Sequence, residues 1–166
     1  MRGRLVCNET TMTYDITLRP AGSGADCASI LAEIPEWFGM PQSNANYARL
    51  AEEGPAYVVE VDGRAEGLMI LKPHFDSAVE IYFLAVRPGR HRKGIGRALV
   101  EAANALAAER GAAYVTVKTL GPSAQYEPYA RTRAFYRGVG FLPLEEFTEN
   151  WDPENPALFM VRPVRP

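Results

Sequence analysis

Apolar and polar residues alternate with period two in several short stretches of the chain and recur with a helical period in others. The alternating stretches predict strands. These are residues 14–18, 56–61, 65–72, 78–86, 114–120, 141–147 and 157–164. The stretches with apolar residues three or four positions apart predict helices. These are residues 25–34, 44–53, 94–110 and 126–137.

The order of these elements predicts the class of fold. Asp62-Gly63 separates two predicted strands, which is typical of a type I′ hairpin turn. Three strands follow one another, and the third leads into a helix and another strand, which indicates one mixed α/β sheet. The 166 residues suit one compact domain. We place that domain at 13–166, with 1–12 as an N-terminal extension and Met12 as an alternative start.

Composition excludes several classes of protein. The formal net charge of −2 argues against a dedicated nucleic-acid binder. No apolar run approaches the roughly 20 residues of a membrane span, and the N-terminus lacks the apolar region of a signal peptide, so we expect a cytoplasmic protein with no membrane partner. Two cysteines and two histidines form neither a disulfide framework nor a metal site. His74 has no chemical partner in the sequence, and we expect it to be structural or exposed.

The most informative segment is residues 90–97, Arg-His-Arg-Lys-Gly-Ile-Gly-Arg, between a predicted strand and a predicted helix. The first amides of a helix have no acceptor within it, and its positive end attracts anions. Gly94 and Gly96 let the backbone approach a ligand closely. The pattern predicts a phosphate-binding loop, with a glycine-eased turn and a solvated basic face as the alternative. It is neither a Rossmann fingerprint, which needs glycine in place of Leu99, nor a Walker loop, which needs lysine in place of Ile95.

Two motifs resemble those of the GNAT superfamily of acetyltransferases. The first is residues 80–88, Glu-Ile-Tyr-Phe-Leu-Ala-Val-Arg-Pro, with the loop and the Arg-Ala-Leu that follows it. The family pattern in the loop is Arg/Gln-x-x-Gly-x-Gly/Ala, and His91 departs from its first position. The second is residues 132–141, Thr-Arg-Ala-Phe-Tyr-Arg-Gly-Val-Gly-Phe, which is similar to the tyrosine-bearing helix of the family and the Gly-Phe after it. Tyr129 and Thr132 stand where the family often has Asn and Ala.

The resemblance implies a fold and a cosubstrate. The fold is a central, mostly antiparallel sheet, splayed between strands four and five and flanked by helices. The reaction is the direct transfer of an acetyl group from acetyl-CoA to an amine, without a metal. The loop amides would hold the pyrophosphate, and the backbone of the fourth strand would hold the pantetheine arm. The cofactor-binding residues implied in this way are Leu84, Ala85, Val86, His91, Arg92, Lys93, Gly94, Ile95, Gly96, Arg97, Tyr129 and Thr132.

The resemblance also implies catalytic roles. Glu80 corresponds to the general base of one branch of the family and would act directly or through a water; a solvent-exposed glutamate at the sheet end is the alternative. Tyr136 would protonate the departing thiolate, because a phenol keeps its proton at neutral pH; the alternative is a core aromatic. Trp37 and Phe38 would form part of the acceptor pocket, with ordinary capping of the core as the alternative.

Two other functions remain open at this point. The chain could be an acyl-CoA-binding regulatory module without turnover, or a nucleotide-binding protein of another kind. As an enzyme it would act on a small-molecule or peptide amine, as a monomer or homodimer. Glu145, Glu146, Asp152 and Glu154 could attract a cationic amine or simply face solvent.

Overall fold

The computed structural model describes residues 14–152 and 154–165. The predicted extension at 1–12, with Met12, lies outside these residues. The strands are β1 (Ile16–Arg19), β2 (Ala56–Val61), β3 (Arg64–His74), β4 (Ala78–Val86), β5 (Tyr114–Leu120), β6 (Leu142–Asp152) and β7 (Asn155–Pro163). The helices are α1 (Gly24–Ala32), α2 (Pro41–Glu53), α3 (Ile95–Glu109) and α4 (Glu127–Gly138), with two 3₁₀ turns, η1 (Pro88–Arg90) and η2 (Pro122–Ala124).

The strands form one mixed, mostly antiparallel sheet in the order β1-β2-β3-β4-β5-β7-β6. Strand β4 runs parallel to β5, whereas β1 with β2, β2 with β3, β5 with β7 and β6 with β7 are antiparallel. The pairing of β4 with β5 runs from Ala78 opposite Tyr114 to Ile81 opposite Val117 and goes no further among the described residues. The predicted mixed α/β sheet, splayed between the fourth and fifth strands, is therefore confirmed.

The chain forms two compact units, and three elements run from one into the other. Within the described residues, the first unit comprises 14–71 and 83–102, and the second comprises 72–82 and 103–165. Strands β3 and β4 and helix α3 each contribute to both. That residues 13–166 make a single functional domain stays a prediction.

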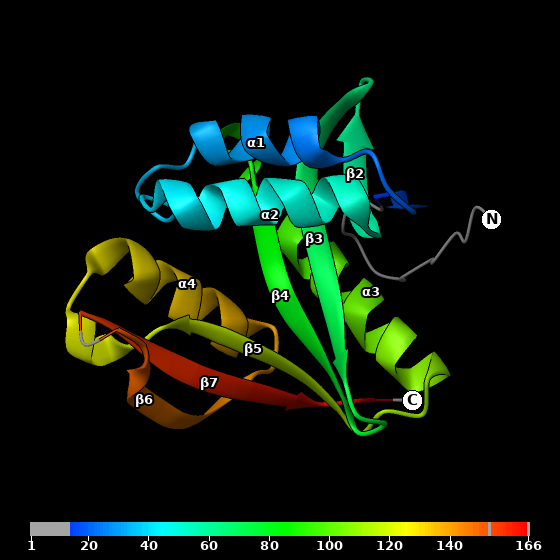
Figure 1. Ribbon diagram of the computed structural model, residues 1–166. Coiled ribbons are helices and arrows are strands. Elements are labelled where there is room, and N and C mark those ends of the chain that lie inside the picture. Colours follow the sequence, from blue (N-terminus) through cyan, green and yellow to red (C-terminus); the bar gives the residue numbers. More distant parts are fainter. Residues whose placement is uncertain (1–13, 153, 166) are drawn as a thin grey trace. The chain divides into compact units, whose positions relative to one another are not determined.

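In the first unit, α1 and α2 pack along each other (Figure 1). Ile30 and Leu31 of α1, Val58 of β2 and Leu68 of β3 are all buried. The hairpin between β2 and β3 turns at Asp62 and Gly63, whose φ angles are 53° and 77°. Positive φ at both central residues is the requirement of a type I′ turn, so the predicted turn is confirmed.

In the second unit, β5, β7 and β6 form an antiparallel group, and α4 packs on β5 (Figure 1). Val115, Val117, Phe141 and Met160 are buried in it. Strand β6 continues to Asp152, beyond the predicted end at 147. The reason is its pairing with β7: cross-strand hydrogen bonds carry the strand through polar residues that have no apolar alternation.

Gly67 of β3 lets the beginning of α3 approach the sheet closely. A Cβ added at Gly67 would lie 2.6 Å from Cγ2 of Ile95 and 3.4 Å from Cδ1 of Leu99. Both of these side chains are almost fully buried, so neither can turn away into solvent. The absence of a side chain at position 67 therefore decides how the first turn of α3 is seated.

We expect Gly67→Ala to lower the free energy of unfolding by about 1–3 kcal/mol, the usual cost of an extra methyl group in a packed interior. Urea denaturation measures the change. The matched control is Gly138→Ala, because a Cβ at Gly138 meets nothing within 4 Å and alanine favours the end of α4. Equal stability of the two variants would show that α3 can shift away from β3 without cost.

Candidate functional site

The loop 90–97 ends at the N-terminus of α3, as predicted. The backbone carbonyl of Gly94 accepts the first intrahelical hydrogen bond, from the Ala98 amide at 2.9 Å, so Gly94 is the N-cap. Ile95 is 1% exposed and anchors the first turn in the core. The amides of this turn have no acceptor inside the helix, and the helix dipole adds positive potential at the same place. The arrangement suits an anion.

The backbone of the loop is held in a conformation that few residues adopt. Arg92 and Gly94 have φ angles of 60° and 92°. Glycine adopts the second value freely, whereas a residue with a Cβ does not. Arg92 has no such freedom, and a residue of its kind in the left-handed region costs about 1–3 kcal/mol. The surrounding contacts must offset that cost.

Three contacts fix the loop. The ring Nε2 of His91 lies 2.7 Å from the Val86 carbonyl at the end of β4. The hydroxyl of Tyr14 donates to the Lys93 carbonyl at 2.8 Å. Arg90 pairs with the buried Glu66 at 3.6 Å. His91, the departure from the family pattern, is thus positioned to close the loop onto β4, and the charge of Arg90 is partly balanced.

The charge of the loop comes mainly from three exposed cations, Arg92, Lys93 and Arg97. Gly94 and Gly96 are half-buried between them. Cationic side chains around exposed helix amides are the donor set that a pyrophosphate requires. The predicted phosphate-binding residues therefore lie on one short segment with complementary charge.

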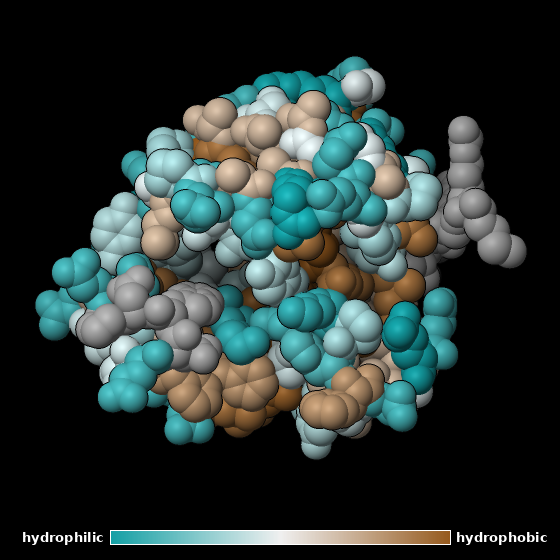
Figure 2. Space-filling model, viewed as in Figure 1, coloured by the Kyte–Doolittle hydropathy of each residue, from teal (hydrophilic) through white to brown (hydrophobic). Residues whose placement is uncertain are grey.

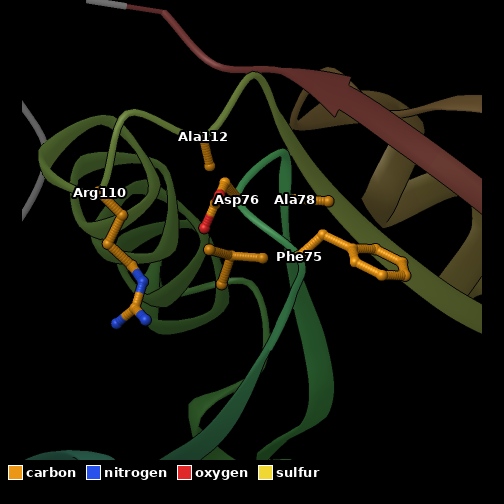
Figure 3. A pocket seen from close by; sticks show the side chains of 6 residues that line it. Phe75, Asp76, Ala78, Arg110 and Ala112 are labelled. Carbon is orange, nitrogen blue, oxygen red and sulfur yellow. The ribbon is translucent and has the colours of Figure 1, made fainter.

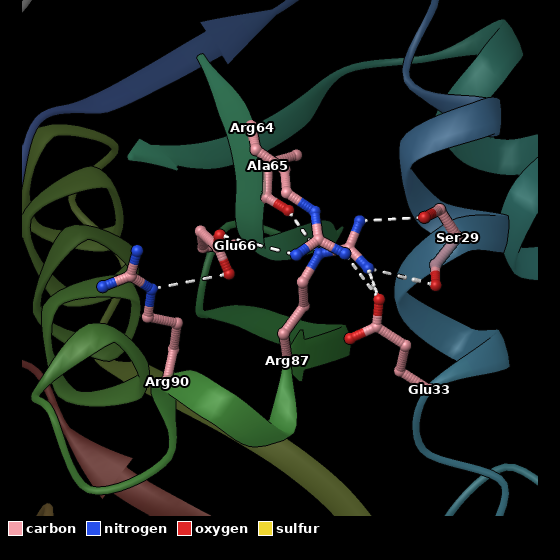
Figure 4. A network of polar contacts seen from close by, with 7 residues as sticks. All are labelled: Ser29, Glu33, Arg64, Ala65, Glu66, Arg87 and Arg90. Carbon is pink, nitrogen blue, oxygen red and sulfur yellow. Dashed lines mark hydrogen bonds and ion pairs between the residues drawn. The ribbon is translucent and has the colours of Figure 1, made fainter. Parts of the chain in front are cut away.

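Arg87 immediately precedes the loop, and its buried side chain fixes the point at which the loop begins (Figure 4). Its guanidinium donates from Nε to the Ala65 carbonyl at 2.8 Å, from Nη2 to Ser29 Oγ at 2.9 Å and from Nη1 to Glu33 Oε1 at 2.5 Å. Its backbone amide donates to the Glu66 carbonyl at 2.9 Å. Arg87 thereby ties the end of β4 to β3 and to α1.

The predicted acceptor residues Trp37 and Phe38 lie in different surroundings. Trp37 meets the His91 ring edge-on, with 5.7 Å between centroids. Phe38 packs on Tyr47 and Phe83 at 5.9 Å and 5.4 Å, in an aromatic group over the core. Trp37 is thus brought to the loop, whereas the packing of Phe38 fits the capping alternative.

The predicted pantetheine segment of β4 alternates in burial. Ala85 is buried, whereas Leu84 and Val86 are half-buried. The pairing with β5 ends at Ile81, before this segment. Strand β5 therefore does not use the backbone groups of residues 84–86.

Glu80 is buried and engaged by two partners, which sequence reasoning missed. Glu80 is 4% exposed, so the alternative of a solvent-exposed glutamate is wrong. Oε2 lies 2.5 Å from Nε2 of His74, and Oε1 lies 2.7 Å from Nζ of Lys118. His74 does have a chemical partner, contrary to expectation. The sequence predicted that this strand would end at Lys72, two residues before His74. The proximity of His74 and Glu80 across the two strands was therefore not predicted.

Tyr136 lies on the inward face of α4. It is 6% exposed and packs against Phe135 and Phe141, with centroids 5.2 Å and 5.3 Å away. Burial raises the pKa of the Tyr136 phenol well above its usual value, and the nearby Tyr129 raises it further. The hydroxyl therefore remains a proton donor, and no hydrogen-bond partner for it is present among residues 14–152 and 154–165.

Tyr129, Thr132 and Arg133 share this side of α4 and are half-buried or buried. Nη1 of Arg133 donates to the Leu120 carbonyl at 2.9 Å and so attaches the helix to the end of β5. The recurrence of Tyr129, Arg133 and Tyr136 on one helical face agrees with the spacing in the sequence.

Two hollows in the surface contain none of the predicted site residues. One, of about 220 Å³, lies at the turn between β3 and β4, where the side chains of Phe75 and Arg110 point away from each other (Figure 3). The other, of about 350 Å³, is lined mainly by alanines of α1 and α2, with Leu31 and Asn44. In Figure 2, weakly hydrophobic side chains are interspersed with hydrophilic ones over these two helices. The first hollow contains one carboxylate, that of Asp76, and the second is lined by no acidic, basic or nucleophilic side chain.

Other reactive groups are few. Cys27 is fully buried, and burial raises the pKa of its thiol to about 12, so it stays protonated. Glu146, one of the predicted acidic residues, accepts hydrogen bonds from the amide and hydroxyl of Ser123 at 3.0 Å and 2.8 Å. No cluster of potential metal ligands occurs in the described part of the chain. None of its helices is long and apolar enough to cross a membrane.

Comparison with known proteins identifies the family. A model described as an acetyltransferase (GNAT) domain matches residues 52–143. A search of curated proteins found no match. Among solved structures, a GNAT-family protein from Desulfovibrio desulfuricans is 18% identical, with a TM-score of 0.77 over 90% of this chain and 99% of that one.

Two further structures share the fold. The ribosomal-protein-S18-alanine N-acetyltransferase of Escherichia coli is 20% identical, with a TM-score of 0.67 over 91% of this chain and 95% of that one. A GNAT family acetyltransferase from Elizabethkingia anophelis, with acetyl-CoA bound, is 16% identical, with a TM-score of 0.63 over 89% of this chain and 97% of that one. The fold, the two motifs and the family model, which covers more than half of the chain, agree: the protein belongs to the GNAT family of acetyltransferases.

Proposed function

We propose that this protein is an N-acetyltransferase that moves an acetyl group from acetyl-CoA directly to an amine, without a metal. The observation that carries the proposal is the loop before α3. A left-handed glycine caps the helix there, its first-turn amides lack intrahelical acceptors, and three exposed cations surround it. The residues present fit a pyrophosphate group, and two similar structures contain CoA or acetyl-CoA.

In this proposal the chain binds acetyl-CoA in three parts. The amides of residues 92–96 and the charges of Arg92, Lys93 and Arg97 hold the pyrophosphate, with His91 fixing the loop. The backbone of Leu84, Ala85 and Val86 holds the pantetheine arm like an added strand. Tyr129 and Thr132 of α4 complete the cofactor-binding set. The buried Arg87 holds the end of β4, where the loop begins, and thus supports the first two parts.

The transfer needs a group that takes a proton from the acceptor amine, because an ammonium has no lone pair. We assign this role to Glu80, acting directly or through a water. Its position on β4, next to the proposed pantetheine segment, supports the assignment. Its two hydrogen-bonded partners, His74 and Lys118, hold the carboxylate in one orientation.

The transfer also needs a proton for the departing thiolate. We assign it to the Tyr136 hydroxyl. The raised pKa keeps this phenol protonated at neutral pH, and its hydroxyl has no hydrogen-bond partner in the described part of the chain.

The acceptor is a small-molecule or peptide amine, and Trp37 and Phe38 are the proposed pocket residues. The fold does not select between these acceptors: similar structures include an aminoglycoside 6′-N-acetyltransferase and a ribosomal-protein N-acetyltransferase.

The direct test is release of CoA from acetyl-CoA in the presence of a panel of amines. We expect turnover that depends on the amine, with the acetyl group recovered on nitrogen by mass spectrometry. Binding of CoA in a thermal-shift assay without turnover for any amine would favour the regulatory module. Stabilisation by ATP but not by CoA would favour a nucleotide-binding protein.

Gly94→Val should weaken CoA binding strongly, because a β-branched residue is strained at a φ of 92° and places a Cβ where the pyrophosphate would approach. Isothermal titration of CoA measures the loss. Gly89→Ala is the matched control in the same loop region, since a Cβ there meets nothing within 4 Å, and it should bind as the parent does. CoA affinity unchanged in Gly94→Val would place the phosphate site elsewhere.

Tyr136→Phe should lower turnover by about 10²-fold, the usual contribution of a general acid. It removes one hydroxyl and keeps the ring that packs on Phe141, so CoA affinity and melting temperature should stay near those of the parent. The loss should shrink with acyl donors whose thiol is more acidic, because such leaving groups depend less on protonation. A variant that is less stable but fully active would instead make Tyr136 a core residue.

A further inference from the structure

Glu80 is unlike a base that acts alone, because each of its carboxylate oxygens already receives a hydrogen bond. Lys118 Nζ lies 2.7 Å from Oε1, and His74 Nε2 lies 2.5 Å from Oε2. The carboxylate is buried, with its side chain 6% exposed. Each oxygen keeps a second lone pair, but a proton placed on it would remove the negative charge that is paired with Lys118.

His74 has the opposite character. Its side chain is 40% exposed, so it can exchange protons with solvent. The 2.5 Å contact requires one proton between Nε2 and the carboxylate, and beside an ionised carboxylate that proton belongs to the imidazole. In the neutral ring Nδ1 then holds the lone pair. In the part of the chain that the structure describes, Nδ1 has no hydrogen-bond partner.

The three side chains come from three strands of the second unit: His74 from β3, Glu80 from β4 and Lys118 from β5. Within the second unit, the other charged side chain on these strands is Lys72, whose Nζ lies 5.3 Å from the centre of the Tyr82 ring. A carboxylate that fixes one nitrogen of an imidazole and leaves the other basic is the arrangement by which histidine serves as a general base.

We infer that Glu80 acts through His74, and that Nδ1 of His74 takes up the proton lost by the acceptor amine. This inference rests on the proposed function and moves the role of direct proton acceptor from Glu80 to His74. As the new N–C bond forms, the N–H bond breaks and its proton passes, directly or through one water, to Nδ1. The C–S bond breaks at the same time, and the thiolate takes the proton of Tyr136. Solvent then removes the proton from His74 and restores that of the phenol. Glu80 stabilises the imidazolium and stays ionised throughout, and Lys118 holds Glu80 in place.

The test compares His74→Gln with the parent protein at saturating acetyl-CoA and amine. Glutamine can still donate a hydrogen bond to Glu80, but it cannot take up a proton in the neutral range. We expect kcat to fall by about 10²-fold, with the KM for acetyl-CoA and the melting temperature unchanged. We expect the acid side of the pH–rate profile to lose one protonation in His74→Gln and to keep that of the acceptor amine. A His74→Gln variant that keeps both the kcat and the pH profile of the parent overturns the inference.

Chemical rescue and tautomer state provide second measurements. Added imidazole should restore part of the rate of His74→Ala and none of the rate of Tyr136→Phe, whose missing group is a phenol. Nitrogen-15 NMR of neutral His74 should show the proton on Nε2. The signals of the other histidine, His91, are assigned from the spectrum of His74→Gln. Absence of rescue together with a proton on Nδ1 overturns the inference.

Failure of the proposed function is distinguishable from failure of this inference. A parent protein that transfers no acetyl group to any amine overturns the proposed function, and with it the role of His74. A parent that works, alongside an equally active His74→Gln, overturns the role of His74 only.

Discussion

The site of this protein depends on the satisfaction of buried charge at the end of β4. Arg87 is 3% exposed, and a buried guanidinium is tolerated only when its donors are matched. Ser29 of α1, Glu33 at the C-terminal end of that helix and the Ala65 carbonyl of β3 provide the acceptors. Because these partners come from elements far apart in the chain, satisfying one charge fixes β4, β3 and α1 together. The loop that follows starts from this fixed point, which allows it to hold Arg92 at a positive φ.

The same constraint applies to the buried charge on β4 itself. Glu80 is buried, and it is matched by one group from each neighbouring strand, His74 and Lys118. Two buried charges, one on β4 and one directly after it, are thus compensated in different ways. Arg87 donates to a backbone carbonyl, a hydroxyl and a carboxylate, which suits a structural role. Glu80 is joined to a half-exposed imidazole, which suits proton exchange.

Much of the fold could be predicted from the sequence. The spans 56–61, 78–86 and 114–120 agree with β2, β4 and β5 because buried strands are continuous apolar or alternating runs with clear turn residues at their ends. The ends of β3 and β6 were predicted too short, since Lys72, Pro73 and His74, and the polar residues after Phe147, carry no apolar alternation. Pairing with the neighbouring strand keeps these residues extended. The register of that pairing cannot be predicted from the residues of one strand alone.

For the candidate site, the sequence by itself determined the loop at the start of α3 and the family. Both depend on residues close together in the chain: two glycines, a cluster of cations and a helix period. Only the tertiary structure decided that His74, Glu80 and Lys118 meet, that Tyr136 is buried with a raised pKa, and that His91 faces Trp37. The physical reason is that side chains on neighbouring strands become partners through register and burial. These join positions up to 38 residues apart, as with Glu80 and Lys118, and no local sequence pattern indicates them.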